Sequence, residues 1–325
     1  IVFFSFNAGK YAMSWEGFSI YWYGKAFSNP LIMEALRTSV IIALTTAVLS
    51  AIIGTLTALG LERTRGWLRV TFDALIYVAI MVPGIVIGIS TLIAFVSVFD
   101  LVNPSLAGIG IKLQMGTWAV IAAHVLFNIA VVALLVRARL QGMDRSLVDA
   151  SEDLYATPLG TFRQVVLPLL APSILAGFLL AFTFSFEDFI IAYFVSGPDT
   201  TLPIYIFSSI RRGVTPEINA VGSVVLLLFL LLFGFAGLRI ALQCRTNQQR
   251  LIAIGCTTIL VGQAILNIAV ATGSMPTTGL PLPLISYGGN SLMASLLICG
   301  LLLRCSLEGS GLSPTPRRHR PAAAR

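Results

Sequence analysis

The sequence predicts an all-α protein, a polytopic bundle of transmembrane helices. Of its 325 residues, 57% are hydrophobic and only 11% are charged, and the mean hydropathy is +0.90. A chain of this composition is too apolar for a soluble domain, whose surface must be covered by polar groups. Apolar runs long enough to cross a hydrocarbon core of about 30 Å recur along it. Inside such runs only helices satisfy their own backbone hydrogen bonds, which gives the fold class.

The apolar runs follow one another in a regular order. The opening IVFFSF is predicted to be the last turns of a helix whose beginning is missing or very short. The next segment, residues 7–30, is rich in Trp and Tyr and is expected at a membrane interface on the outer surface. We then predict membrane helices at 39–60, 74–99, 115–136, 171–195, 219–241 and 251–272, and a shorter one near 288–305.

The basic residues indicate how the chain is oriented. The formal net charge is +7, but Lys and Arg are dispersed around the apolar runs, which favours membrane orientation over binding of nucleic acid. If residues 61–73, 137–171, 239–250 and 304–325 face the cytoplasm, they hold 15 of the 21 Lys and Arg residues. We therefore predict a multi-pass protein whose C-terminus is cytoplasmic.

An abrupt change of composition divides the chain near residue 243. All 20 Phe and all four Trp residues lie at or before Phe235, whereas all four Cys residues lie after Leu242. We therefore predict four parts, which are a domain of residues 1–242 with a truncated first helix, a polar joint at 243–250, a helical hairpin at 251–305 and a basic tail at 306–325. The tail is expected to be disordered, either as a topology anchor or in contact with anionic membrane lipids.

The composition argues against a metal site. The chain has two His residues, His124 in an apolar run and His319 in the tail, which excludes a metal site built from several histidines. The four Cys residues lack metal-type spacing, and thiols in or beside apolar helices usually serve as small packing residues. We predict no metal site.

A polar stretch at residues 137–172 lies between two long apolar runs. A membrane-spanning chain rarely keeps such an amphipathic segment unless it docks something in the aqueous phase, although an ordinary interfacial helix is the alternative. Its most specific residues are Asp149, Ala150, Ser151, Val165, Leu167 and Pro168. In spacing they resemble the cytoplasmic coupling loop of binding-protein-dependent ABC importer permeases, which reads Glu-Ala-Ala, three residues, Gly, nine residues, Ile-x-Leu-Pro. The resemblance implies that this helix seats in a groove of a nucleotide-binding subunit and transmits ATP-driven closure.

The loop departs from that pattern in three places. Tyr155 stands where the family has Gly, Asp149 replaces Glu, and Ser151 replaces the second Ala. Because Gly permits a turn or a close backbone approach, we expect that Tyr cannot copy it. The departures predict that the loop makes a weakened or altered contact with the nucleotide-binding subunit.

The stretch that follows the loop extends the resemblance. The segments SFEDF, VSGP, LPIYI and RRGVTPEINA, within residues 185–220, are similar to the spermidine/putrescine branch of these permeases. Upstream, GFSIYWYGKAF and MVPGIVIGIS agree with the same branch. The resemblance covers about residues 1–240.

Two adjacent carboxylates, Glu187 and Asp188, lie deep in an apolar run. Carboxylates at such depth are costly unless they face a polar pathway or a partner. For a polycationic substrate, carboxylate and aromatic groups would lower the barrier at the narrowest point, so we predict that Asp188, with Glu187, lines the translocation path. The alternative is a hydrogen bond between packed helices or a neutral buried acid.

Small residues in another run predict close helix packing. Gly84 and Gly88 follow Pro83 and form a face that lets a neighbouring helix approach. A kink at Pro83 could serve gating, but packing is the stronger interpretation.

The segment after the joint carries a second motif. Its residues are Gln263, Asn267, Gly273, Pro276, Thr277, Thr278, Gly279, Pro281, Pro283, Ser286, Tyr287, Gly288, Gly289 and Ser291. They resemble the C-terminal helix pair of the SEDS proteins, the cell-shape and division glycosyltransferases FtsW and RodA. The resemblance implies a carboxylate in a large external loop, which this segment lacks, since the only acidic residue after Glu217 is Glu308. We therefore predict no glycosyltransferase activity.

These resemblances imply the membrane subunit of a polyamine-type ABC importer in a bacterial plasma membrane. The chain has no GxxxxGK[ST] phosphate loop, so we predict no catalytic residue and no cofactor of its own, with ATP bound by a partner. The implied partners are an ATPase dimer, a second homologous permease and an external solute-binding protein. Two alternatives stay open, namely a peptidoglycan-synthesis component and a non-functional product of gene fusion.

Overall fold

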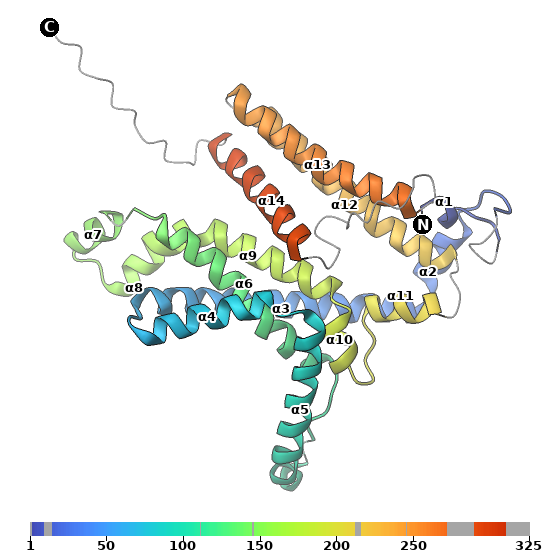
Figure 1. The fold of residues 1–325 in the computed structure, drawn as a ribbon, viewed down its shortest axis with the longest axis horizontal. Helices are drawn as coiled ribbons and strands as arrows, with labels where there is room; N and C mark the ends of the chain where they lie inside the picture. The colour runs from blue at the N-terminus through green and yellow to red at the C-terminus, as the bar shows by residue number, and fades with distance from the viewer. Residues whose placement is uncertain are drawn as a thin grey trace. The chain divides into compact units, whose positions relative to one another are not determined.

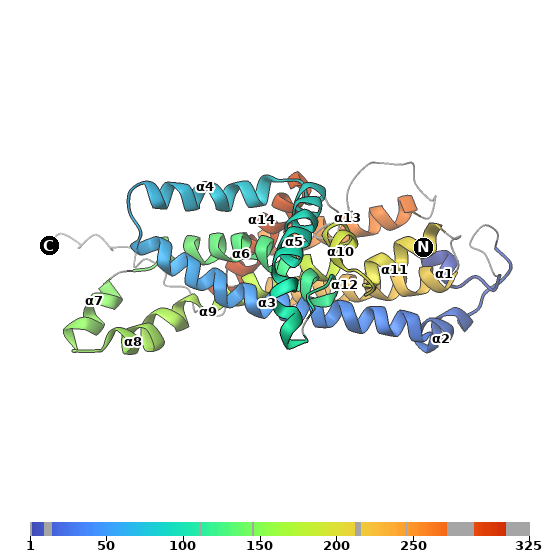
Figure 2. The same cartoon turned by 90° about the horizontal axis from the view of Figure 1, so that it is seen from below.

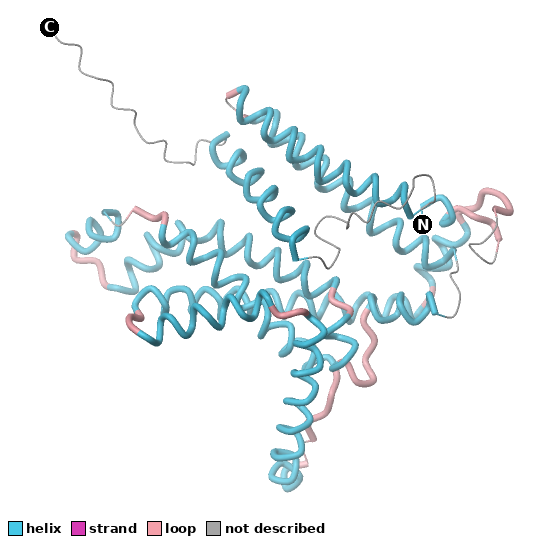
Figure 3. Tube along the Cα trace, in the orientation of Figure 1, coloured by secondary structure: helices cyan, strands magenta, loops and turns pink. Residues whose placement is uncertain are grey.

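The protein is helical throughout the part that the structure describes. The computed structural model describes residues 2–9, 15–110, 112–144, 146–211, 216–244, 246–271 and 289–309. Within these ranges every regular element is a helix, apart from one isolated β-bridge between Asn7 and Phe18 (Figure 3). The predicted all-α fold class is therefore confirmed.

The helices form two compact units. We call Phe27–Arg212 the central unit, and Ile1–Ala26 together with Gly213–Arg325 the split unit. The central unit contains α3 (Pro30–Arg63), α4 (Trp67–Met81), α5 (Gly84–Leu106), η1 (Ala107–Ile109), α6 (Thr117–Gln141), α7 (Ser146–Asp153), α8 (Pro158–Thr161), η2 (Phe162–Val166), α9 (Leu167–Glu187), α10 (Ile190–Val195) and α11 (Leu202–Arg211). The split unit contains α1 (Val2–Ser5), most of α2 (Tyr21–Ser28), α12 (Pro216–Gln243), α13 (Asn247–Ala271) and α14 (Gly289–Gly309).

Three long helices, α3, α6 and α9, make the core of the central unit and lie alongside one another (Figures 1 and 2). Small residues allow the close approach. An added Cβ at Gly54 on α3 would stand 2.7 Å from Val132 Cβ, and one at Gly177 on α9 would stand 3.1 Å from a methyl of the same side chain. The fully buried Val132 therefore fills the space that two glycines leave, which is how membrane helices commonly pack.

Two predicted spans prove to be interrupted. The run 74–99 is not one helix, because α4 ends at Met81 and α5 begins at Gly84. Val82 takes an extended conformation (ψ 130°), as expected for a residue that precedes proline. The run 171–195 is likewise divided, since α9 ends at Glu187 and α10 begins at Ile190.

The predicted packing role of Gly88 is confirmed. An added Cβ at this position would lie 2.8 Å from a ring carbon of Phe194 and 3.3 Å from Ile191 Cα, both on α10. The glycine thus lets α10 cross α5 at close range.

The core of the split unit is built from small and thiol-bearing residues. Cys244, Cys256 and Cys305 are buried in one apolar cluster with Ala, Leu and Ile residues of α12, α13 and α14. The expectation that these thiols pack as small side chains is confirmed. Gly237 on α12 faces Thr257 on α13 so closely that an added Cβ would stand 2.8 Å from Thr257 Cβ.

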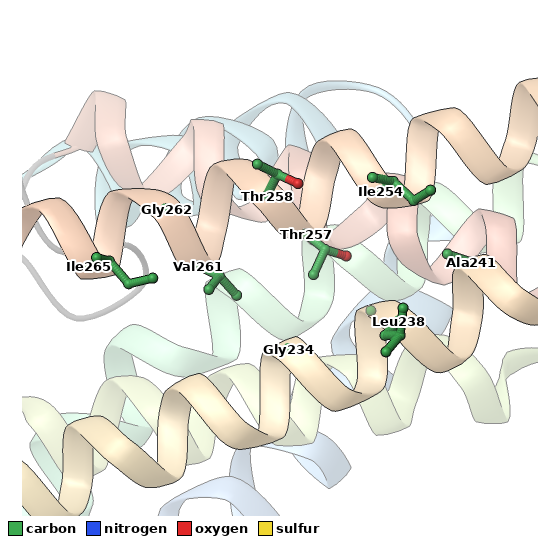
Figure 4. A pocket seen from close by; sticks show the side chains of 10 residues that line it. Gly234, Leu238, Ala241, Ile254, Thr257, Thr258, Val261, Gly262 and Ile265 are labelled. Atoms are coloured by element: carbon green, nitrogen blue, oxygen red, sulfur yellow. The ribbon is translucent and has the colours of Figure 1, made fainter.

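An apolar hollow opens beside this contact between α12 and α13. Its volume is about 380 Å³, and it is bordered by Gly234 and Leu238 on one helix and by Val261 and Ile265 on the other (Figure 4). Thr257 points toward α12 in the same view (Figure 4), and its hydroxyl donates to the Ala253 carbonyl oxygen at 2.7 Å. The hollow therefore offers apolar surface and little polar chemistry.

Five helical segments of the described chain are long and apolar enough to cross a membrane. They are Pro30–Arg63, Gly84–Leu106, Thr117–Gln141, Pro158–Glu187 and Asn247–Leu266. This result agrees with the predicted multi-pass arrangement.

Candidate functional site

The polar loop between α6 and α9 folds as a short helical hairpin, and its first helix begins at a capped turn. The Asp144 carboxylate accepts the Ser146 amide hydrogen at 3.0 Å. Hydrogen bonds from the Ser146 side chain and amide hold the pKa of Asp144 below its ordinary value. A carboxylate at this end also suits the partial positive charge of a helix N-terminus. The helix that follows, α7, has no fully buried residue, and most of its side chains are exposed and available to a partner.

Tyr155 ends α7 in a left-handed turn. Its φ is +58°, and it is the single non-glycine residue with positive φ in the described chain. The Ala156 amide donates to the Ser151 carbonyl at 3.1 Å and the Tyr155 amide to the Glu152 carbonyl at 2.9 Å, the hydrogen bonds of a Schellman motif. The expectation that Tyr cannot copy the turn of Gly is therefore wrong, because the two hydrogen bonds hold the left-handed backbone.

The second helix, α8, is capped and tied to α7. Thr157 accepts the Gly160 amide hydrogen at 3.2 Å, and Pro158 occupies the first helical position. The hydroxyl groups of Ser151 and Thr161 lie 3.0 Å apart and join the two helices. The hairpin is thus fixed by its own hydrogen bonds.

The predicted coupling residues are distributed along this hairpin. Asp149 and Ala150 are exposed on α7, and Val165 is half-buried in the π-helical stretch η2. Leu167 and Pro168 begin α9. The hairpin lies at one end of the central unit, and α10 lies toward the other (Figures 1 and 2).

The carboxylate of Asp188 sits at the interruption between α9 and α10. Its backbone is extended (ψ 120°), and Oδ2 accepts the Ala192 amide hydrogen at 2.9 Å. The same oxygen lies 3.2 Å from His124 Nε2 on α6. Asp188 therefore caps α10 and links it to α6.

His124 completes a buried polar network in which it is the partner of Asp188 that sequence reasoning did not identify. Its side chain is 2% exposed, and Nδ1 lies 2.7 Å from the Ser185 hydroxyl oxygen. A neutral imidazole with its proton on Nε2 satisfies both contacts, donating to Asp188 and accepting from Ser185. Asn128 donates to the His124 carbonyl oxygen at 2.9 Å. The signal that could have revealed it is a lone His in one apolar run together with a carboxylate in another.

Glu187 is half-buried beside this network, and aromatic rings gather after it. The rings of Phe189 and Phe207 have centroids 4.4 Å apart, and both border a hollow of about 190 Å³ that Tyr193 also lines. Arg211 stands at the edge of this hollow with its guanidinium 4.9 Å from the centre of the Phe207 ring. Carboxylate and aromatic groups therefore lie close together along the chain, with Arg211 at the margin.

Two further polar links hold α6 at its ends. At the start of the helix, Asp199 accepts from the Thr117 amide at 2.6 Å and from its hydroxyl at 2.7 Å. Near the other end, Arg137 forms a two-pronged ion pair with Asp73 of α4, in which Nη2 and Oδ2 are 3.0 Å apart. Both links were missed by sequence reasoning, because each joins residues more than 60 positions apart.

The second motif lies mostly outside the described residues. Gln263 and Asn267 are on α13, and Gly289 begins α14. The positions outside the described residues are Gly273, Pro276, Thr277, Thr278, Gly279, Pro281, Pro283, Ser286, Tyr287 and Gly288.

Comparison with known proteins finds a match to a cell cycle protein family in the C-terminal part of the chain. The family described as "Cell cycle protein", which includes FtsW, RodA and SpoVE, matches residues 206–310. The probable peptidoglycan glycosyltransferase FtsW of Synechocystis is 39% identical over 180 residues, which are 55% of this chain and 43% of that protein. The chain therefore spans less than half of this relative.

A second family covers most of the remaining chain. The family described as "Binding-protein-dependent transport system inner membrane component" matches residues 50–242, which overlap the first match over 206–242. The putrescine transport system permease protein PotI of Escherichia coli K12 is 40% identical over 229 residues, which are 70% of this chain and 79% of that protein. The spermidine/putrescine permease protein PotC of Haemophilus influenzae is 37% identical over 229 residues, 84% of its length. The chain therefore belongs to the family of binding-protein-dependent transport system inner membrane components.

Proposed function

We propose that this chain is the membrane subunit of an importer for putrescine, spermidine or a related polyamine. The observation that carries the proposal is the similarity to two polyamine permeases over 229 residues. The expected partners are an ATPase dimer, a second homologous permease and an external solute-binding protein. The expected location is a bacterial plasma membrane, with the C-terminus in the cytoplasm.

The coupling surface is assigned to the hairpin of α7 and α8. Its helices are fixed by the contact of Ser151 with Thr161 and by the Schellman turn at Tyr155. A rigid hairpin with an exposed face can receive a push from an ATPase subunit and pass it to α9, which continues the chain. The sequence motif from Asp149 to Pro168 supports this role.

The translocation path is assigned to the interruption between α9 and α10. A carboxylate at this depth is expensive unless it is paired or lines a polar path. Asp188 is paired with His124 and the Ala192 amide, while the neighbouring Glu187 and the ring of Phe189 lie beside it in sequence. A passing cation would compete with the imidazole for the carboxylate, so the network would hold the path closed until substrate arrives.

Reconstitution tests the proposal directly. The chain, the second permease and the ATPase are placed in proteoliposomes with labelled putrescine, with the solute-binding protein outside. We expect ATP-dependent uptake, and the Asp188→Asn variant should lose about tenfold in rate, which corresponds to about 1.4 kcal/mol. Asn keeps an acceptor for the Ala192 amide but carries no charge.

Matched variants separate a path role from a folding role. Asp100 is an exposed carboxylate on α5, so Asp100→Asn should transport at the rate of the unchanged chain. Normal uptake by Asp188→Asn would refute the path assignment and leave the importer intact. If Asp188→Asn lowers the Tm as well as the uptake rate, Asp188 would be assigned to folding alone. Failure of the unchanged chain to bind an ATPase would refute the importer.

A second function is favoured by one observation, the match of residues 206–310 to FtsW-type proteins. Under this proposal the chain is a scaffold in peptidoglycan synthesis, since the sequence after Glu217 has a single acidic residue to serve as a base. Purification from membranes discriminates the two, because a scaffold would co-purify with a transpeptidase and a permease with an ATPase. Sequencing the native locus across codons 235–255 would identify an artefactual fusion.

A further inference from the structure

We propose that Tyr155 is an anchor residue, which inserts its ring into an apolar pocket of the ATPase subunit and so selects which ATPase this permease accepts. This inference rests on the proposed function, and it deepens it by naming the residue that decides the partner. Three observations support it, namely the left-handed backbone of Tyr155, the exposure of its ring and the acidic residues nearby on α7.

The backbone shows that the turn alone does not account for a tyrosine here. A non-glycine residue in the left-handed region is strained, and glycine would hold the same turn without that strain. Tyr155 is at φ +58°, with the amide of Ala156 bonded back to Ser151. The strained side chain must therefore provide something that glycine lacks.

The exposure of the ring shows that packing of the side chain within this chain does not offset the strain. Tyr155 is 95% exposed, and the adjacent Leu154 is 82% exposed. Leu159 on α8 is 75% exposed. Two adjacent large apolar side chains, Leu154 and Tyr155, are thus exposed at the turn of the hairpin outside the candidate membrane spans, and exposed apolar groups in such a place typically mark an interaction site.

The charges around this tip define the complementary partner. Asp149, Glu152 and Asp153 are exposed on α7, and its last turn contains no basic residue. Exposed carboxylates on the helix that precedes Tyr155 fit a pocket with an apolar floor and Lys or Arg residues at its edge. Tyrosine is among the residues that most often dominate binding energy in such pockets, because its ring buries a large area.

The test measures ATPase binding to the full chain, paired with the second permease, in nanodiscs. The variants are Tyr155→Gly, which keeps the turn and removes the ring, and Tyr155→Phe, which keeps the ring. Trp67→Ala is the matched control, because Trp67 is an aromatic residue, 74% exposed, outside residues 137–172. The Tm of each variant reports on folding.

We expect the dissociation constant of Tyr155→Gly to rise roughly 10- to 30-fold. Its Tm should be equal to or above that of the unchanged chain, because the strain is relieved. Tyr155→Phe and Trp67→Ala should bind within about threefold of the unchanged chain, and binding should weaken as salt is raised.

Each other outcome refutes a definite part of the inference. Undiminished or tighter binding of Tyr155→Gly would show that residue 155 serves the turn only, while the importer assignment would stand. Equal weakening by Trp67→Ala would show a nonspecific aromatic effect. Absence of ATPase binding by the unchanged chain would overturn both the anchor and the proposed function.

Discussion

The two compact units of this protein differ in what lies between their helices. In the central unit, charged and polar side chains link helices over long sequence distances, as in the pairs Arg137 with Asp73 and His124 with Asp188. In the split unit, α12, α13 and α14 meet through alanine, leucine and cysteine. Of these pairs, His124 and Asp188 lie within apolar runs, where charged groups are expensive and commonly mark a pathway or a moving part. The translocation path that we propose therefore lies in the central unit, whereas the described core cluster of the split unit is packed by apolar side chains and thiols.

The largest expected effect comes from breaking the ion pair of the central unit. Arg137→Met leaves the Asp73 carboxylate, only partly exposed, without its cation. We expect the free energy of unfolding to fall by about 3 kcal/mol, measured by thermal or chemical unfolding in detergent. The matched change in the split unit is Arg239→Met at an exposed position of α12, which should stay within about 0.5 kcal/mol.

A double variant isolates the electrostatic part of that effect. Asp73→Leu combined with Arg137→Met removes both charges, and it should recover most of the lost stability because no charge is left unpaired. If the single variants are as stable as the unchanged chain, the contrast between the units is not electrostatic.

The next prediction compares glycine contacts in the two units. Gly54→Ala in the central unit and Gly237→Ala in the split unit each place a Cβ within 2.8 Å of a neighbouring side-chain carbon. Each should lower the free energy of unfolding by about 1–3 kcal/mol. Gly60→Ala and Gly255→Ala are the controls, since their added Cβ meets nothing within 4 Å, and they should be neutral or stabilising. A loss at Gly54 without one at Gly237 would show that the split unit packs more loosely.

The smallest expected effect is a pH dependence confined to the central unit. The pKa of Asp144 is lowered in the folded hairpin, so its contribution is present above the unfolded pKa and is lost as pH falls through the folded one. Hydrogen exchange of the α7 amides, corrected for intrinsic rates, should therefore rise in acid. The α13 amides should change less, because residues 247–271 contain no Asp, Glu or His. If the exchange of the α7 amides still rises in acid in the Asp144→Asn variant, titration of Asp144 is not the cause.

The sequence predicted the helices well where a single run of apolar residues makes a single helix. α6 and α13 begin and end within a few residues of the runs at 115–136 and 251–272. The two interrupted runs failed for a common reason, since hydropathy does not sense backbone geometry. Val82 is extended because a proline follows it, and α9 stops at Glu187 because Asp188 turns to cap the next helix.

The candidate site was predictable in position but not in its contacts. The motif located the hairpin from Asp149, but the left-handed turn at Tyr155 depends on two backbone hydrogen bonds that no single residue reveals. Asp188 stood out as a carboxylate in an apolar run, whereas its partner His124 is 64 positions away. Contacts over such distances depend on how helices pack, which local pattern does not determine.

The π-helical stretch η2 has a consequence for how force travels. Helical structure is continuous from Pro158 to Glu187, 30 residues, so the hairpin is joined to the Asp188 interruption by a shaft of about 45 Å. A π-helical turn holds one residue more than an α-helical turn, so it shifts the angular phase of everything beyond it by about 100°. The five residues of η2 therefore set the direction, about the helix axis, in which Glu187 and Asp188 lie at the C-terminal end of α9. Rewinding η2 into an α-helix would convert a push on the hairpin into a rotation of that end.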